Sequence, residues 1–194
     1  MTANTASLLD FPPAPPISGG RKPFRYTLKR YHEVIDAGII TENDRVELIF
    51  GEIVEKMGIG KRHGDCLDII NEYFVLKYAG RALCRSQNPL IIGDNSEPEP
   101  DYAIIDKVKY ATRKGKPEAE DVHLLVEISD ATLDYDRSTK ATMYALANIP
   151  EYWLINLKQN QLELYLNPNT ESGEFNFIQK FSAEADITSP ICGE

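Results

Sequence analysis

Two short apolar runs, each carrying one carboxylate, constrain the fold of this chain more than any other feature. The first is EPDYAIID, residues 99–106, and the second is LLVEISD, residues 124–130. In the second, a strand period of two places three aliphatic side chains on one face and Leu125, Glu127 and Ser129 on the other. Proteins keep a carboxylate inside an apolar strand mainly where it is paired, protonated or bound to a metal. An exposed strand face or a structural ion pair accounts for Glu127 alone equally well.

Length and composition favour a single folded domain. The 194 residues suffice for one sizeable core and are too few for two, and the 42% hydrophobic and 26% charged residues are typical of a soluble chain. Residues 1–23 hold five of the twelve prolines. We therefore expect a flexible proline-rich arm over residues 1–23 and one domain over residues 24–194.

The absence of a long apolar run, the cysteine spacing and the net charge limit the classes of function that this chain can have. No run approaches the roughly 20 apolar residues that span a bilayer, and the first residues do not resemble a secretory signal. The three cysteines are widely separated and have no zinc-ligand spacing, as expected for reduced thiols. We expect a cytoplasmic protein with no membrane segment. The net charge of −9 argues against indiscriminate binding to phosphate backbones, so a nucleic-acid site must hold its positive charge locally.

Hydrophobic periodicity predicts interleaved helices and strands. Helices are expected between Thr27 and Gly38, from His63 to Gly80, and from about Arg137 to Ala147. A β-hairpin is expected about Phe50-Gly51, and further strands are expected in ALCRSQNPLII, DYAIID, VHLLVEIS, EYWLINL, QLELYLN and EFNFIQKF. Without a strict βαβ rhythm, this order favours an α/β or α+β fold, and we assign an α/β fold with a mixed β-sheet flanked by α-helices.

Asp101 gains its importance from pairing with Glu127. Alone, Glu99-Pro100-Asp101 is ordinary turn chemistry at the start of a strand. If the two strands are neighbours, Asp101 and Glu127 converge on one side of the sheet and offer several oxygen ligands. Without a Cys/His cluster, these ligands favour Mg²⁺ or Mn²⁺ over zinc.

Lys140 is the third candidate, thirteen residues after Glu127 (140 − 127) on the helix that follows that strand. This helix can pack back across the sheet. A lysine beside two carboxylates and a metal could position the attacking water or stabilise negative charge developing on a phosphate. The alternative is an Asp136–Lys140 pair at i, i+4 on a solvated helix, worth about 0.3 kcal/mol.

These residues, in this order, resemble the Uma-type family of putative restriction endonucleases within the PD-(D/E)XK nuclease superfamily. The resemblance covers about residues 25–166. Its landmarks are VELIFGE, the His63 that opens a helix, PEPDYAIID, LLVEISDAT, DRSTKATMYA and IPEYWLINL.

The resemblance implies a restriction-endonuclease-like mixed sheet and metal-assisted phosphodiester hydrolysis. Asp101 matches the PD acid and Glu127 the second acid of the superfamily. The superfamily lysine would stand two residues after the second acid, where this chain has Ser129. In the Uma-type relatives that lysine has moved to the following helix, which matches Lys140, and catalysis requires a place in space rather than in sequence.

Two further residues are candidates through the same resemblance. Glu47, in VELIFGE, matches an acid on an early hairpin that could reach the metal directly or through water, and a paired strand acid is an equally good account. His63 could contact substrate, although an exposed polar residue at a helix start is the simpler interpretation.

The segment KVKYATRKGK, residues 107–116, has five basic residues and no acid. A loop there would leave the sheet near the rim of the site, where Lys114 and Lys116 could hold a DNA backbone. A solvated loop is the commoner reason for such a charge run.

The sequence thus predicts a magnesium-dependent endonuclease that hydrolyses DNA phosphodiester bonds through Asp101, Glu127, Lys140 and Glu47. The alternatives are a catalytically silent binding or regulatory module of the same fold, and a metal hydrolase of smaller phosphate esters. A homodimer would suit an enzyme that cuts both strands, and the sequence leaves this open.

Overall fold

The computed structural model of this chain describes residues 22–182. At its centre is one six-stranded sheet with strand order β3-β4-β5-β6-β7-β8. Strands β5 and β6 run parallel, and every other neighbouring pair is antiparallel, so the predicted mixed sheet is confirmed. The strands are β3 (Leu83–Ser86), β4 (Tyr102–Ile105), β5 (Val122–Ser129), β6 (Glu151–Asn156), β7 (Gln161–Asn169) and β8 (Glu174–Ser182).

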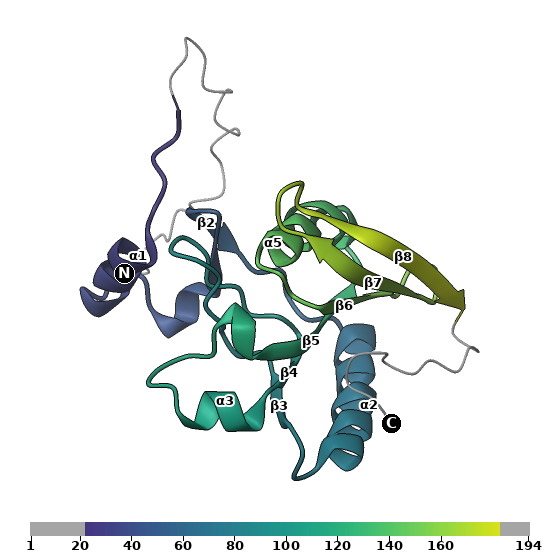
Figure 1. Cartoon of the computed structure of the whole chain (residues 1–194). Coiled ribbons are helices and arrows are strands. Elements are labelled where there is room, and N and C mark those ends of the chain that lie inside the picture. The colour runs from purple at the N-terminus through teal and green to yellow at the C-terminus, as the bar shows by residue number, and fades with distance from the viewer. Residues whose placement is uncertain (1–21, 183–194) are drawn as a thin grey trace, which may run out of the picture.

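Helices cover both faces of this sheet (Figure 1). Helix α2 (Lys61–Tyr78) packs Leu67, Phe74 and Tyr78 onto one face. The other face is covered by one helical segment, composed of α4 (Leu133–Tyr135), the π-helical turn η3 (Asp136–Lys140) and α5 (Ala141–Leu146).

The predicted alternation of β5 is confirmed by these two cores. Leu124, Val126 and Ile128 belong to the cluster beneath α2, and Leu125 belongs to the cluster beneath α5. Glu127 is therefore on the α5 face of the sheet. Complete burial of an aliphatic side chain stabilises a fold by about 1.5–3 kcal/mol, so these two clusters fix the position of β5.

The predicted hairpin is also present, as a separate two-stranded sheet of β1 (Val46–Ile49) and β2 (Glu52–Glu55). Phe50 and Gly51 at its turn have φ values of 49° and 78°, because a two-residue type I′ turn needs positive φ at both positions. Leu48 exchanges backbone hydrogen bonds with Glu97, and the Gly51 N–H donates to the Asn95 carbonyl. These bonds hold the hairpin beside the segment that leads into β4.

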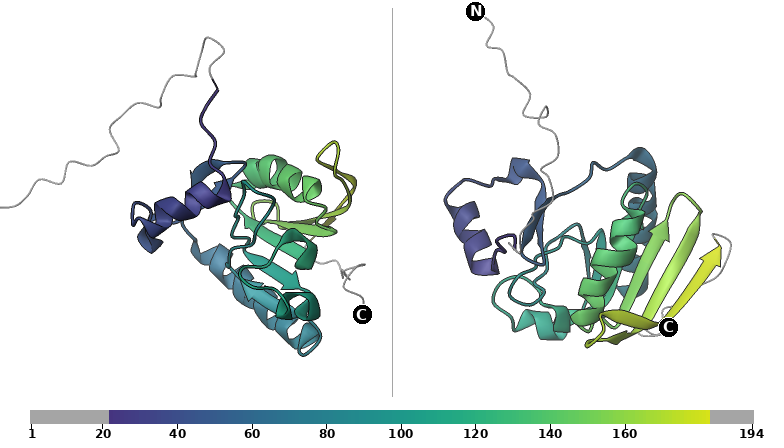
Figure 2. Two further views of the ribbon diagram at one scale, coloured as in Figure 1. Left: turned by 60° about the vertical axis from the view of Figure 1, so that its left-hand side comes forward. Right: turned by 90° about the horizontal axis from the view of Figure 1, so that it is seen from above.

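Helix α1 (Leu28–Asp36) lies on the hairpin's side of the molecule, with the 3-10 helix η1 (Glu42–Asp44) leading from it into β1 (Figure 2). Its N-cap is Thr27, whose hydroxyl accepts a hydrogen bond from the Arg30 N–H, as the sequence predicts.

The local structure differs from the sequence prediction in three places. The run expected to stay extended to Ile92 ends as a strand at Ser86, because Gln87 has a φ of 48° and Pro89 has no N–H to donate. The helix expected from Arg137 begins at Leu133. The expected loop over residues 107–116 begins with helix α3 (Lys107–Ala111), and η2 (Ala119–Asp121) follows.

Residues 1–21 of the expected N-terminal arm lie outside the described residues. Within residues 22–182, no helix is both long and apolar enough to cross a membrane.

We expect Gly51→Ala to lower the free energy of unfolding by about 2 kcal/mol or more. An added Cβ would lie 2.8 Å from the Tyr26 carbonyl oxygen and 2.9 Å from the Arg25 Cβ, in addition to the strain of a positive φ. Gly38→Ala is the matched control, since Gly38 has a φ of 70° and open space around it, and its cost should be about 1 kcal/mol. Urea unfolding of both variants measures the difference, and equal losses would show that close packing at the hairpin turn contributes nothing.

Candidate active site

The pairing of β4 with β5 brings the two strand carboxylates together. Tyr102 pairs with Val126, so Asp101, one residue before β4, lies opposite Glu127. Asp101 Oδ2 accepts a hydrogen bond from the Ile128 N–H at 2.8 Å, and its Oδ1 accepts one from Gln87 Nε2 at 3.3 Å. The convergence predicted from the sequence is present.

Glu127 is buried and its Oε1 atom accepts two hydrogen bonds. Lys140 Nζ donates at 3.0 Å and the Tyr144 hydroxyl at 2.6 Å. Both donors come from the helical segment over the sheet, where Tyr144 follows Lys140 by one turn. The helix that follows β5 therefore packs back onto the Glu127 strand, as expected.

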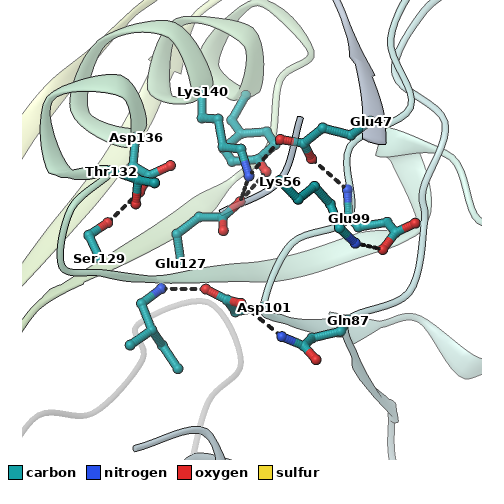
Figure 3. A network of polar contacts seen from close by, with 12 residues as sticks. Glu47, Lys56, Gln87, Glu99, Asp101, Glu127, Ser129, Thr132, Asp136 and Lys140 are labelled. Carbon is teal, nitrogen blue, oxygen red and sulfur yellow. Dashed lines mark hydrogen bonds and ion pairs between the residues drawn. The ribbon is translucent and has the colours of Figure 1, made fainter. Parts of the chain in front are cut away.

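Lys140 lies between two carboxylates (Figure 3). Its Nζ is 3.0 Å from Glu127 Oε1 and 3.3 Å from Glu47 Oε1, and all three side chains are buried. Glu47 Oε2 accepts a hydrogen bond from the Glu99 N–H, which orients the carboxylate toward the lysine. The alternative interpretation, an Asp136–Lys140 pair on a solvated helix, is wrong, because both side chains are buried. Glu47 is therefore a paired strand acid, and it also lies in the wall of the cavity described below.

Asp136 forms a second, adjoining network. Its Oδ2 accepts hydrogen bonds from the Ser129 hydroxyl at 2.5 Å and the Thr132 hydroxyl at 2.6 Å. Ser129, which stands where the superfamily pattern has lysine, thus fixes the first turn of η3. That π-helical turn ends at Lys140, and single π turns are frequent at functional sites.

The electrostatics of the cluster are set by burial and by an excess of acids. Burial raises the pKa of Glu127 to about 8, Lys140 opposes this shift, and Asp101, Asp136 and Glu47 add to it. Burial alone would lower the pKa of Lys140, but the carboxylates around it outweigh burial and the pKa is raised. The raised pKa keeps the lysine protonated, and three acids act on it: Glu127, Glu47 and Asp136.

A cavity of about 640 Å³ opens beside this cluster. Its wall includes these three acids, Asp101 and Lys140, and it continues along the connection from β2 to α2, residues 56–60, and the start of α2. Within the described residues, no group of three or more His, Cys, Asp or Glu side chains is arranged to hold a metal ion.

The simpler interpretation of His63, an exposed residue at a helix start, is wrong. Helix α2 begins two residues earlier, at Lys61, and only 15% of the His63 side chain is exposed. Its Nε2 lies 3.0 Å from Asp101 Oδ2, and this hydrogen bond raises the pKa of the imidazole against the effect of burial. His63 therefore orients Asp101 from the wall of the cavity.

The expectation that the basic segment 107–116 lies at the rim of the site is also wrong. Asp101 precedes β4, whereas the segment leaves the other end of that strand, after Ile105. Neither Lys114 nor Lys116 lines the cavity. Lys116 forms an ion pair with Glu97, and Lys114 is exposed.

Comparison with known proteins identifies the family of this chain. The model of the Uma2 family, described as "Putative restriction endonuclease", matches residues 28–188. The chain belongs to the Uma2 family. The Uma2 match extends further toward the C-terminus than the resemblance to residue 166 seen in the sequence.

A solved structure shares the fold of this Uma2 chain. It is described as a putative nuclease belonging to DUF820 from Anabaena variabilis ATCC 29413, with 19% identity and a TM-score of 0.62. The match covers 85% of this chain and 89% of that one. No curated protein shows a significant match.

Two residues that donate hydrogen bonds to the site acids, Tyr144 and Gln87, were not anticipated from the sequence. Tyr144 had a usable signal, because it follows Lys140 by four residues and so shares its helical face. Gln87 had none, since its contact with Asp101 depends on the positive φ that ends β3.

We expect Glu127→Gln to melt at a higher temperature than the parent at about pH 8 in chelator. The pKa of Glu127 is raised from 4.5 to about 8 on folding, so the folded protein binds this proton more tightly than the unfolded chain does. The parent therefore loses stability as the pH rises from about 4.5 to about 8. The glutamine does not titrate, so the advantage should shrink toward about pH 5. His63 titrates in both proteins and cancels in the comparison.

Glu163→Gln is the matched control for this measurement. Glu163 is also a buried strand acid, but hydrogen bonds from Arg137 and Tyr165 outweigh its burial and lower its pKa. This variant should melt below the parent at about pH 8. If Glu127→Gln does the same, the Lys140 ion pair is a net stabilising contact and the cluster is not strained.

Proposed function

We propose that this Uma2 protein is a magnesium-dependent endonuclease that hydrolyses DNA phosphodiester bonds. The observation that carries the proposal is the buried Lys140, which lies between Glu127 and Glu47 in the cavity that Asp101 also lines. Membership in a family described as putative restriction endonucleases, and a fold shared with a putative nuclease, support a nuclease.

The donor set fits a magnesium ion better than a softer metal. Mg²⁺ takes oxygen ligands, keeps several waters and usually binds through one or two protein carboxylates, so a larger ligand cluster is not required. Asp101 and Glu127 would hold the ion, and Mn²⁺ would fit the same ligands. The excess of acids around Lys140 favours a further cation. Bound there, the ion would supply Lewis-acid stabilisation of phosphate charge and lower the pKa of a water.

Lys140 would supply a preorganised positive charge. Its ammonium group is fixed by Glu47 and Glu127, so it would stabilise negative charge developing on the phosphate without reorganising. Glu47 acts through the lysine in this scheme. His63 and the Ile128 N–H hold Asp101 in place, which is the role we assign to His63.

A catalytically silent module of the same fold is the second candidate. It is favoured by Glu127 Oε1, which already accepts hydrogen bonds from Lys140 and Tyr144. A chain that binds DNA but not magnesium would support this candidate.

We expect phosphodiester cleavage to require Mg²⁺ or Mn²⁺ and to stop in chelator. Magnesium should also stabilise the folded parent by about 2.7 kcal/mol at a hundred times its dissociation constant, and Asp101→Asn should lose most of this gain. Thermal unfolding with and without magnesium measures the gain, and plasmid nicking measures cleavage. Activity that survives thorough chelation would remove the metal from the mechanism.

Replacing Lys140 with methionine should lower the cleavage rate at least about 100-fold, because the charge that stabilises the transition state is lost. Some stability will be lost as well, since buried carboxylates are left unpaired. Cleavage is therefore compared at a temperature where circular dichroism shows both proteins folded. Lys158→Met, at an exposed lysine outside the cavity, is the control and should cleave like the parent. Unchanged cleavage by Lys140→Met would leave the lysine a purely structural role.

A further inference from the structure

The groups assigned to chemistry lie deep in the cavity. Glu127, Glu47 and Lys140 are 3%, 5% and 7% exposed, so a phosphate must enter the cavity to meet them. These groups line a cavity of about 640 Å³, so they lie in a recess and not on an open face of the molecule. Duplex DNA is stiff, with a persistence length of about 50 nm, and bending it into a recess costs energy.

The mouth of the cavity has a different chemistry from its floor. Arg45, Lys61 and Arg62 line the cavity and are exposed, whereas Glu127, Glu47 and Asp136 are buried. Two exposed acids, Glu55 and Asp130, also line it, so the mouth carries only a small positive excess. Lys61 also pairs with Asp65 at 2.6 Å, so Arg45 and Arg62 supply most of the local positive charge on a chain whose net charge is −9.

Apolar side chains stand among these cations. Met57 and Ile59 line the same cavity and are 62% and 47% exposed, in a run that is exposed from Met57 to Gly60. Tyr135 adds an aromatic ring to the wall. A phosphate backbone gains nothing from apolar side chains, and the bases of a duplex are stacked away from them. Unpaired bases expose apolar faces that can pack on Met57 and Ile59, and cations can track the backbone as they do in single-strand binding proteins, where aromatic rings hold the bases.

From these observations we propose that the cavity accepts an unpaired DNA strand and that the edge formed by Arg45 and residues 57–61 contacts it. This rests on the proposed nuclease function for the identity of the ligand, and it adds the substrate class. The cations Arg45 and Lys61 contact phosphates, and Met57 and Ile59 pack on bases.

Binding is measured by fluorescence anisotropy with a labelled 30-nucleotide single strand and with a blunt duplex of the same sequence. The parent is titrated in chelator, and Lys140→Met is titrated in magnesium, so that cleavage does not interfere. The single strand should bind at least about 10-fold more tightly than the duplex. Arg45→Ala with Lys61→Ala should weaken single-strand binding at least about 5-fold and reduce the salt slope by about 0.7 per lost contact. Met57→Ser with Ile59→Ser should weaken it similarly and leave the slope unchanged.

Matched controls come from the opposite end of β4 and from the outer face of α2. Lys107→Ala with Lys114→Ala removes two exposed lysines from the basic segment 107–116, and Leu76→Ser with Val108→Ser removes two apolar side chains that are 75% and 77% exposed. Neither pair lines the cavity, and both should bind like the parent.

The outcomes separate this inference from the proposed function. The inference would be overturned if the duplex bound as tightly as the single strand or more tightly. It would also be overturned if the variants at Arg45, Lys61, Met57 and Ile59 bound like the controls, or if no DNA bound in either buffer. Cleavage of intact duplex as fast as of single strand would also overturn it while keeping the nuclease. Selective single-strand binding without cleavage in magnesium would support the inference and reject the enzyme.

Discussion

The structure depends on the buried ammonium group of Lys140. It joins three elements that are distant in the sequence: the hairpin strand β1 through Glu47, the sheet strand β5 through Glu127, and the helical segment that carries the lysine. Moving such charges out of water costs several kcal/mol for each ion, and the mutual attraction offsets this only when partners and geometry are complete. The three elements are therefore fixed relative to one another by the two ion pairs of Lys140. Loss of the hairpin would leave the lysine underpaired, and loss of the lysine would leave two acids underpaired.

This dependence explains why the small hairpin is fixed so firmly outside the main sheet. The Gly51 turn packs against Tyr26, Leu48 bonds to the segment before β4, and the Glu47 carboxylate is oriented by the Glu99 N–H. These contacts place Glu47 within reach of Lys140. A site that must be held within about 0.5 Å needs this kind of support from elements whose own positions are packed.

Sequence reasoning recovered what depends on local periodicity. The alternation in β5 places Glu127 on one face, and the i, i+4 spacing of α2 defines its buried side, because strand and helix geometry follow directly from the pattern. It also brought Asp101 and Glu127 together, since consecutive strands usually pair.

The errors concern features that depend on direction and on distant partners. The basic segment 107–116 is next to Asp101 in sequence, yet it begins after β4 whereas Asp101 precedes that strand, so one strand length separates Asp101 from the start of the segment. A charge count does not contain that information. His63 looked exposed because its partner, Asp101, lies 38 residues away, and no local pattern encodes that contact. The π turn before Lys140 was missed for the same reason, since the Ser129–Asp136 bond that anchors it joins β5 to the helix.

The burial that gives Lys140 its chemical value also limits what can reach it. A positive charge acts most strongly on a phosphate where water is excluded, and exclusion of water requires a recess rather than an open surface. A recess admits only ligands that are narrow or flexible enough to enter it, whatever their base sequence. Access alone can therefore discriminate an unpaired strand from a stiff duplex. Selectivity and catalytic electrostatics would then follow from one physical cause, the depth at which β1, β5 and η3 meet.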